Sequence, residues 1–265
     1  MPPKNATRWP ALLPWIIPGV LLLVWSAVSA ARLVPLYLLP SPGDIVAAAH
    51  GYIFGAPGEA PYAGRFLTDL RASLVRICLG FGLAVLLGLP LGILSGRLAA
   101  FQKLVSNTIH AARAVPGIAW LPLALVWFGI GLPATTFLVC LAAFFPIYLN
   151  TASGARQVNP LLYQAGAMLG IGPVRGIFTI LMPAAMPQIV SGLRLGLGIA
   201  WAYLVLGELT GVADGLGAII MDARMLGRID LIMVGIIVIA VMGRLSDDLL
   251  QLLLKLCFKS ARRIS

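Results

Sequence analysis

Long apolar segments, separated by shorter polar ones, dominate the pattern of this chain. A helix of about 20 apolar residues crosses the hydrocarbon core of a bilayer, and six segments approach or exceed that length. They cover residues 11–31, 71–95, 103–128, 133–150, 188–211 and 231–254. The pattern therefore predicts an all-α integral membrane protein with six transmembrane helices.

The first apolar segment, at residues 11–31, has an alternative interpretation. It ends in Val28-Ser29-Ala30, which resembles a signal-peptidase site. The apolar part of a signal peptide has only about 7–15 residues, so we favour an uncleaved helix. Residues 32–69 follow as a mostly polar connection, in which Leu39-Pro40-Ser41-Pro42 opens a short amphipathic helix through residues 45–50.

The third apolar segment is too long for one straight span. Residues 103–128 would make about 39 Å of helix at about 1.5 Å per residue, against a hydrocarbon core of about 30 Å. Pro116-Gly117 and Pro122 interrupt the segment. Because proline removes a helical hydrogen bond, they predict a bent or broken helix.

Glycines recur at every fourth residue in the second and fifth segments. Gly88, Gly92 and Gly96 form one such stripe, and Gly192 and Gly196 form another. A face without side chains lets a neighbouring helix approach closely. We therefore expect both helices to pack tightly within a bundle, while the loop at residues 212–230 reads as a polar excursion.

Composition supports a membrane protein. The chain has 60% hydrophobic and 11% charged residues, whereas a soluble domain has about 25% charged residues. The formal charge of +10 could indicate a nucleic-acid partner. The basic residues lie mainly in loops and tails between apolar segments, as orientation in a membrane requires, so no nucleic-acid partner is expected.

One side of the six-span arrangement gathers the basic residues. Both termini lie on that side, together with the loops at residues 96–103 and 153–187. It holds Lys4, Arg8, Arg97, Lys103, Arg156, Arg175, Lys255, Lys259, Arg262 and Arg263. The other side mixes arginines with acidic residues, so the positive-inside rule predicts that the first side, with both termini, is cytoplasmic.

The stretch at residues 164–187 departs from the membrane pattern, because four glycines, three prolines and Arg175 interrupt it. A broken backbone in contact with lipid leaves polar groups unpaired, at a cost of several kcal/mol each. The stretch must therefore lie in water or against protein. Its first part, residues 164–171, predicts a short helix, with Gly172 and Pro173 as the stop signal.

This stretch resembles the cytoplasmic coupling loop of permeases of binding-protein-dependent ABC importers. The motif of that family is Glu-Ala-Ala, three residues, Gly, nine residues, Ile, one residue and Leu-Pro. The matching residues here are Gln164, Ala165, Gly166, Gly170, Ile180 and Met182-Pro183. The spacing agrees throughout and three residue types differ: Gln for Glu, Gly for the second Ala, and Met for Leu. An ordinary cytoplasmic loop is the alternative, and Gly166 weakens a helix by about 1 kcal/mol relative to Ala.

Further motifs are similar to the nitrate, sulfonate and taurine branch of these permeases, and especially to aliphatic-sulfonate permeases. They are Arg113-Ala-Val-Pro116 and the segments at residues 127–131, 145–151 and 192–194. The resemblance covers residues 39–258. It implies the type I ABC importer permease fold, in which a homodimer of permease chains works with two cytoplasmic ATPase subunits and a periplasmic solute-binding protein in a bacterial inner membrane.

The order of spans and loops predicts a division of the chain, and the resemblance implies a set of coupling residues. Residues 1–70 would form an anchor helix and a periplasmic connection, residues 71–256 the permease core with the coupling loop at 153–187, and residues 257–265 a basic cytoplasmic tail. The expected contacts that couple the chain to its ATPase come from Gln164, Ala165, Gly166, Gly170, Ile180 and Pro183.

The sequence contains no motif for catalysis within this chain. It has no G-x-x-x-x-G-K-[ST] phosphate loop, so ATP and Mg²⁺ are expected on the partner ATPase and no cofactor on this chain. G-x-S-x-G and H-E-x-x-H are also absent, and only two histidines occur. Cys78, Cys140 and Cys257 lie in apolar segments and read as small hydrophobic residues. We expect neither catalytic residues nor a metal site, and we do not expect the chain to be an enzyme.

Several charged residues lie inside or near the spans, where each needs a reason because a charge at a helix centre costs about 2.5–3.5 kcal/mol. Arg244 can pair with Asp247 and Asp248 at helical spacing. Arg76 and Arg194 lie near span ends and are expected to reach the headgroups.

Arg113 and Glu208 have no opposite charge within a helical turn. Arg113 lies near the middle of the third span and Glu208 toward the outer end of the fifth. We place both, with Trp127 from an aromatic group expected at a membrane interface, on the substrate path. A direct Arg113–Glu208 pair across helices is the alternative.

These observations together predict an importer permease for a small oxyanion-bearing solute, with aliphatic sulfonate or taurine preferred. ATP binding to the partner would move the coupling helix and alternate the access to a central cavity. Nitrate, cyanate and a thiamin-precursor pyrimidine are alternative solutes. A self-contained channel or membrane enzyme is the alternative of another class, but a channel needs a selectivity filter, and the sequence offers none.

Overall fold

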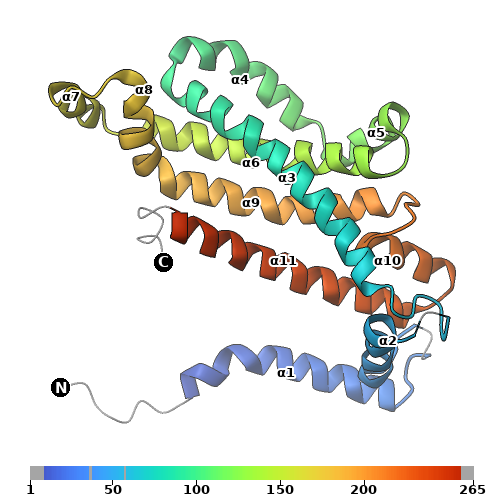
Figure 1. Cartoon of the computed structure of the whole chain (residues 1–265). Helices are drawn as coiled ribbons and strands as arrows, with labels where there is room; N and C mark the ends of the chain where they lie inside the picture. The colour runs from blue at the N-terminus through green and yellow to red at the C-terminus, as the bar shows by residue number, and fades with distance from the viewer. Residues whose placement is uncertain (1–8, 36–37, 57, 258–265) are drawn as a thin grey trace, which may run out of the picture. The chain divides into compact units, whose positions relative to one another are not determined.

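The computed structural model describes residues 9–35, 38–56 and 58–257, and within these ranges the chain is helical without a strand. The helices follow one another as α1 (Trp9–Ala30), α2 (Pro42–Phe54), α3 (Phe66–Arg97), α4 (Ala99–Ala114), η1 (Gly117–Trp120), α5 (Leu121–Phe128), α6 (Leu132–Gln157), α7 (Pro160–Met168), α8 (Pro173–Gly176), η2 (Ile177–Leu181), α9 (Met182–Glu208), α10 (Leu216–Met225) and α11 (Ile229–Cys257) (Figure 1).

The predicted apolar segments all appear as helices. Four helices among the described residues are long and apolar enough to cross a membrane: Phe66–Arg97, Leu132–Gln157, Pro173–Glu208 and Ile229–Leu256. The bent pair Ala99–Ala114 and Gly117–Phe128 makes a fifth span if its two halves cross the membrane as one, and a shorter apolar helix covers Ile16–Ala30 within α1. The described residues therefore show four or five of the six predicted spans at full length. The all-α membrane architecture expected from the sequence is confirmed.

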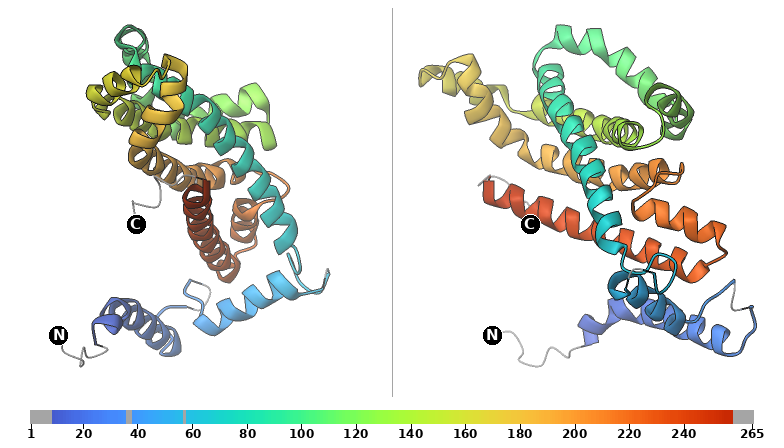
Figure 2. Two further views of the ribbon diagram at one scale, coloured as in Figure 1. Left: turned by 60° about the vertical axis from the view of Figure 1, so that its left-hand side comes forward. Right: turned by 45° about the vertical axis from the view of Figure 1, so that its right-hand side comes forward.

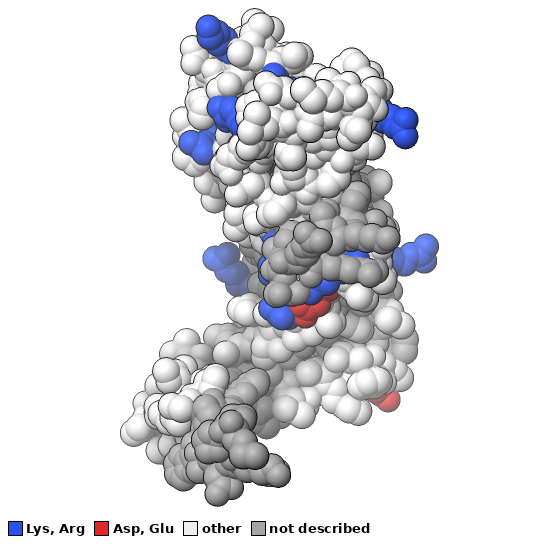
Figure 3. Space-filling view, turned by 90° about the vertical axis from the view of Figure 1, so that its left-hand side faces the viewer, with Lys and Arg blue, Asp and Glu red and all other residues white. Residues whose placement is uncertain are grey.

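Large apolar side chains remain exposed along these helices. Leu79, Leu86 and Leu87 are examples on α3, and Val241 and Leu249 on α11. Such apolar surfaces are stable where lipid replaces water. Figure 3 views the molecule from the left-hand side of Figure 1, along the helices rather than onto their flanks, and most of the charged residues visible there are basic.

The chain divides into two compact units. The first contains residues 1–66 and 222–234, and the second contains residues 67–221 and 235–265. In the first unit, Ser41 caps α2 by accepting from the Asp44 amide, and the Asp44 carboxylate accepts from the Ser41 amide. This capping box explains why the helix starts where the sequence predicted, although it extends further, to Phe54. The functional division at residues 70 and 256 stays a prediction, and the tail from residue 258 lies outside the described residues.

The second unit is built around α6, which packs along α9 and is crossed by α3 (Figures 1 and 2). A Cβ atom on Gly88, Gly92 or Gly96 of α3 would lie within 2.9 Å of an α6 side chain. Gly192 and Gly196 of α9 likewise approach α6 so closely that a Cβ atom would lie within 3.0 Å of it. The predicted close packing of both glycine stripes is confirmed. It removes any need for large side chains between these helices.

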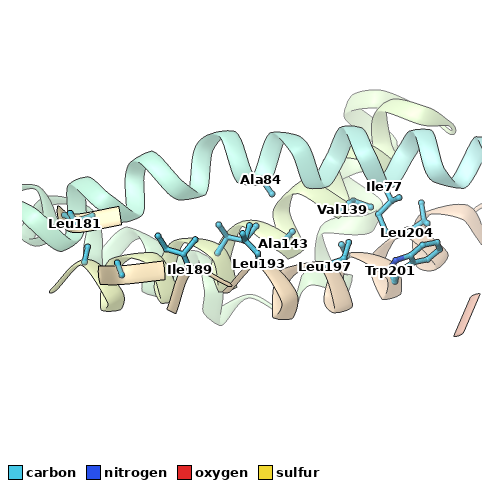
Figure 4. Packing of buried hydrophobic residues seen from close by; sticks show 14 of the residues in the cluster. Ile77, Ala84, Val139, Ala143, Leu181, Ile189, Leu193, Leu197, Trp201 and Leu204 are labelled. Carbon is cyan, nitrogen blue, oxygen red and sulfur yellow. The ribbon is translucent and has the colours of Figure 1, made fainter. Parts of the chain in front are cut away.

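Between the glycine contacts, apolar side chains from three helices fill the core. Figure 4 shows Ile77 and Ala84 of α3, Val139 and Ala143 of α6, and the α9 residues Ile189, Leu193, Leu197, Trp201 and Leu204. The Trp201 indole donates to the Ser246 hydroxyl at 2.8 Å, which ties α11 to α9.

The loop at residues 212–230 is not the polar excursion that its charges suggested. It contains α10, whose residues Leu216, Ala218 and Ile219 are at most 2% exposed. Charged residues such as Asp222 and Arg224 stand on the same short helix and obscured the apolar face, because a helix of this length shows few repeats of its pattern.

Candidate functional site

The third span breaks where the sequence predicted. α4 ends at Ala114, Val115 and Pro116 are extended, and the helix resumes as η1 and α5 after a bend of 88°. The residue before a proline avoids the helical region, which explains the extended Val115. The break places Arg113, in the last turn of α4, beside an irregular stretch of backbone.

A tyrosine from α9 is seated against this break. A Cβ atom on Gly117 would lie 2.0 Å from the Tyr203 hydroxyl oxygen. Only glycine at position 117 leaves room for the Tyr203 ring, so the start of the second half of the broken span packs directly against α9. The sequence offered a signal in Gly117 itself, which follows the proline that already breaks the helix.

A cavity of 370 Å³ opens beside the break, between α4, η1, α6 and α9. Arg113 is the charged residue of its lining, and Asn150 and Tyr203 are polar. Trp120 and Phe145 contribute rings, and the remaining lining is Val115, Gly117, Leu141, Ala142, Pro146, Leu149 and Ile199. Arg113 is exposed and makes no ion pair with a residue in the described ranges.

Glu208 lies elsewhere, in a buried polar cluster. Its side chain is 0% exposed and accepts hydrogen bonds from Ser73 Oγ at 2.7 Å, Arg76 Nη1 at 2.8 Å and the Gly217 amide at 2.8 Å. The sequence showed no opposite charge within a helical turn of Glu208, and its partner indeed comes from another helix, as Arg76 of α3. The alternative Arg113–Glu208 pair is not formed. Its carboxylate faces Arg76 rather than the cavity, which removes the reason for placing Glu208 on the substrate path.

The same cluster corrects the prediction for Arg76. This side chain does not reach toward headgroups but is buried between Glu208 and Asp214. Helical spacing alone did not reveal these partners, because they come from α9 and from the loop after it. A signal was present, however: Asp69, Ser73 and Arg76 are spaced as one face of a helix.

The cluster also binds the free amides that begin α10. The Gly215 amide donates to Asp69 Oδ1 at 3.1 Å, and the Leu216 amide donates to Ser73 Oγ at 2.8 Å. Gly215 has a φ of +128°, and a Cβ atom there would lie 2.6 Å from the Glu208 carboxylate. The first amides of a helix need acceptors, so the cluster joins α3, α9 and α10 in one structure.

Trp127 lies on α5 and outside the lining of the cavity. Its side chain is 56% exposed, and its ring packs edge-on against Phe128 and Phe137. Trp120, seven residues earlier in η1, is the tryptophan that lines the cavity. The sequence could not choose between the two, because the choice depends on the 88° bend.

The two remaining span arginines pair differently from the prediction. Arg244 binds Asp248 at 3.0 Å, as expected from their spacing, but Asp247 binds Arg194 of α9 at 2.8 Å instead. Arg194 therefore does not depend on headgroups. The pair crosses from α9 to α11, which one-helix spacing rules cannot show.

The loop predicted to couple the chain to its ATPase contains a helix, α7, that is shifted from its predicted range. The Asn159 side chain accepts from the Leu161 amide at 2.9 Å and starts the helix at Pro160, and the helix ends at Met168. Gly170 follows with a φ of +73°. The predicted stop at Gly172-Pro173 is wrong. The left-handed Gly170 ends the helix, and Pro173 instead starts α8.

Within the loop, Gly166 and Ile180 of the motif are in contact. A Cβ atom on Gly166 would lie 2.5 Å from Ile180 Cδ1. The Gly166 carbonyl also accepts from the Ile171 amide at 2.9 Å. Gln164, Ala165 and Pro183 are exposed. Gly166, which replaces the second Ala of the motif, therefore lets Ile180 pack against α7.

An arginine from α3 stacks on the coupling helix. The Arg97 guanidinium lies 3.8 Å from the ring centroid of Tyr163, at the end of α3. Burial raises the pKa of Tyr163, and the charge of Arg97 opposes that rise. A cation–π contact of this kind contributes about 0.5–2 kcal/mol, so α7 and α3 are linked by more than the chain between them.

The described residues contain no group of three or more His, Cys, Asp or Glu side chains that could hold a metal ion. Cys78 and Cys140 are free thiols, and the Cys257 side chain lies outside what the structure describes. The site that remains is a cavity with one arginine, together with the loop at the coupling helix.

Comparison with known proteins gives a consistent result. A family model described as "Binding-protein-dependent transport system inner membrane component" matches residues 88–255. A putative aliphatic sulfonates transport permease protein of Bacillus subtilis is 35% identical over 238 residues, 90% of this chain and 83% of the relative. A taurine transport system permease protein of Escherichia coli is 34% identical (86% and 82% covered), and a nitrate import permease protein of Synechocystis is 30% identical (91% and 86% covered).

Among solved structures, the chain resembles inward-facing conformations of the MetNI methionine ABC transporter. The TM-score is 0.58 at 20% identity, with 76% of this chain and 96% of that chain covered. At this identity the likeness concerns the fold, which is that of a type I importer permease.

Proposed function

The chain belongs to the family of binding-protein-dependent transport system inner membrane components, and from that membership we propose that it carries a small oxyanion-bearing organic solute through the membrane for an ATP-driven importer. It is a multi-pass ABC permease of the sulfonate, taurine and nitrate type, a family of transport components rather than enzymes. An aliphatic sulfonate or taurine is the preferred solute. The observation that carries the choice of an oxyanion is Arg113, an exposed guanidinium in the lining of the cavity.

The coupling loop supports a role for a separate ATPase. Large apolar side chains are exposed on α7, α8 and η2 and in the turn between α7 and α8, and their contact with water is unfavourable. They are Leu161, Met168, Leu169, Val174 and Phe178. These side chains lie around the motif residues Gln164, Ala165 and Gly170. We propose that they insert into a groove of the ATPase, which binds ATP and Mg²⁺ in place of this chain.

A second copy of this chain would complete the permease. α4 buries none of its residues in the described structure, although its sequence includes Phe101, Leu104 and Ile109. We propose that α4 contributes to a homodimer interface, with a solute-binding protein on the periplasmic side. ATP binding would then draw the coupling helices together and open the two permease chains alternately toward either side.

Copurification tests the proposal. A tagged chain, expressed with the ATPase and binding protein encoded beside it and purified in mild detergent, should yield two permease chains and two ATPase chains by native mass spectrometry. Binding of solutes to the partner binding protein, measured by thermal shift, should show stabilisation by an alkanesulfonate or taurine. A chain that purifies alone and conducts anions without ATP would contradict the importer and support a channel.

A further inference from the structure

The cavity beside the broken span has one charged group and a largely apolar lining. This combination restricts the chemical class of solute that the cavity can bind. We propose that it is a subsite within the permease for a small monoanion with an uncharged apolar tail, so that an alkanesulfonate binds better than zwitterionic taurine or nitrate. The proposal rests on the proposed function, because it places this subsite on the path of the imported solute.

Charge is the first argument. Arg113 carries the charge of the lining, and no carboxylate is among the lining residues. The acidic groups of the same unit are occupied elsewhere, Glu208 by Arg76 and Asp247 by Arg194. A guanidinium offers a fork of N–H donors that suits an oxyanion, whereas the ammonium group of taurine would find no opposite charge.

Neutral groups do not replace that missing charge. Pro146 has no N–H to donate to the carbonyl of Ala142, so this carbonyl is an uncharged acceptor near the cavity. The rings of Trp120 and Phe145 can attract an ammonium group through their faces. Neither interaction supplies the negative charge of a carboxylate, and the rings serve an alkyl tail equally well.

Hydrogen-bond donors support the head of an anion. The Tyr203 hydroxyl makes no hydrogen bond to a residue in the described ranges, and it is positioned by its contact with Gly117. Asn150 donates one amide hydrogen to the Pro146 carbonyl at 2.8 Å, which fixes the orientation of its side chain at the cavity wall. Tyr203 therefore offers a free donor, and Asn150 has a second one.

Size and polarity distinguish an organic anion from an inorganic one. Ligand pockets range from about 300 to 1,000 Å³, and this cavity, at 370 Å³, falls at the lower end. Leu141, Leu149 and Ile199 supply aliphatic wall. A nitrate ion would use the arginine but leave this wall in contact with water, whereas a short alkyl chain would cover it and gain from burial.

Direct binding measures the subsite without the binding protein. The complex of this chain with its ATPase, held in lipid nanodiscs, is equilibrated with radiolabelled pentanesulfonate, and unlabelled pentanesulfonate, taurine and nitrate compete for it. We expect pentanesulfonate to compete at lower concentration than taurine, and taurine and nitrate to compete weakly. Taurine or nitrate competing as well as pentanesulfonate would overturn the assignment.

Three variants sharpen this measurement. Arg113→Gln should weaken pentanesulfonate binding by about tenfold or more, as expected when a charged hydrogen-bond donor is lost, and Tyr203→Phe by about three- to tenfold. Arg244→Gln is the matched control, because Arg244 lies outside the lining, and it should bind like the wild type. Assembly with the ATPase confirms that each variant is folded.

A specificity change provides the strongest test. Ile199→Asp adds the missing carboxylate at a position of the wall that is 41% exposed, so the protein core stays intact. We expect this variant to bind pentanesulfonate less well and taurine better than the wild type does. Unchanged relative affinities in both Ile199→Asp and Arg113→Gln would overturn the subsite.

Failure of the subsite and failure of the proposed function give different results. If the complete importer takes up alkanesulfonates while Arg113→Gln leaves binding and uptake unchanged, the subsite is wrong and the function stands. If the complete importer takes up no oxyanion, the proposed function is wrong. The nanodisc measurement needs neither uptake nor the binding protein, so it decides on the subsite in either case.

Discussion

The carboxylate of Glu208 illustrates how a charge is kept inside a membrane protein. It accepts hydrogen bonds from three groups, Ser73, Arg76 and the Gly217 amide, and is fully buried. A buried charge that loses its partner is strongly unfavourable, by about 3–5 kcal/mol, whereas an apolar replacement of the whole pair is often tolerated. Removing one partner of the Arg76–Glu208 pair should therefore destabilise the protein more than removing both.

We predict that Arg76→Leu destabilises the protein more than the double variant Arg76→Leu/Glu208→Leu. The single change leaves the carboxylate buried without its cation and should cost about 3–5 kcal/mol. The double change removes both charges. Thermal unfolding in detergent measures the difference, and Arg244→Gln is the control, since the Arg244 side chain is 71% exposed and surface pairs contribute about 0–1 kcal/mol. Equal melting temperatures for the single and double variants would contradict this view of the cluster.

Gly170 provides a second test at the scale of one residue. Its φ of +73° is unfavourable for most side chains by about 1–2 kcal/mol, and for Asp by less. Gly170 also stands where the coupling helix ends, so a side chain there would meet the proposed ATPase surface. Gly170→Asp should insert into the membrane but lose transport or assembly with the ATPase.

The matched control for this change is Gly172→Asp. A Cβ atom on either glycine would meet no other group within 4 Å, so the two positions offer a side chain the same space. Gly172, however, has an extended backbone and caps α8, where Asp is favourable. Uptake by Gly172→Asp should stay close to that of the wild type. Normal uptake by Gly170→Asp, or equal loss in both variants, would argue against a special role of Gly170.

At the scale of helices, the broken third span depends on the contact between Gly117 and Tyr203. We predict that Gly117→Ala lowers thermal stability, because its Cβ atom would lie 2.0 Å from the Tyr203 hydroxyl oxygen. In a Tyr203→Ala background the same change should cost little, since the clash is gone. A double-mutant cycle by thermal unfolding measures this coupling. Additive effects of the two changes would show that the contact does not hold the break in place.

The sequence predicted those helical features that depend on local chemistry. Close helix contacts were predictable at Gly88, Gly92 and Gly192, because a residue without a side chain lets a neighbouring helix approach. The break was predictable at Pro116, because proline cannot donate a backbone hydrogen bond. Pairs across helices were not predictable. Arg76 with Glu208 and Arg194 with Asp247 join residues far apart in the chain, and no spacing rule within one helix identifies them.

The candidate site was predicted in part for the same reason. Arg113 stood out because it has no local partner, and the structure places it in the cavity lining. Glu208 stood out equally, but its carboxylate is paired with Arg76 and is not part of the cavity lining. Trp120, Asn150 and Tyr203 were not identified, because their place in the lining depends on the bend between α4 and α5 and on the packing of α9 against α6.

For the whole molecule, the orientation in the membrane remains a prediction from the basic residues. The coupling loop must face the side that holds ATP if the proposed function is correct. A reporter fused to the C-terminus, active only in the cytoplasm, should therefore be active, and one fused in the turn at Gly211 between α9 and α10 should be silent. If a reporter that works only in the periplasm is active when fused to the C-terminus, the six-span arrangement is wrong.

The most direct test of the importer as a whole is uptake by the reconstituted assembly. Proteoliposomes that contain this chain and its ATPase, with the binding protein outside and ATP inside, are supplied with radiolabelled pentanesulfonate. We expect saturable accumulation that requires ATP and the binding protein, and that Gly170→Asp abolishes. Passive equilibration without ATP, or an assembly that hydrolyses ATP but accumulates no oxyanion, would contradict the account.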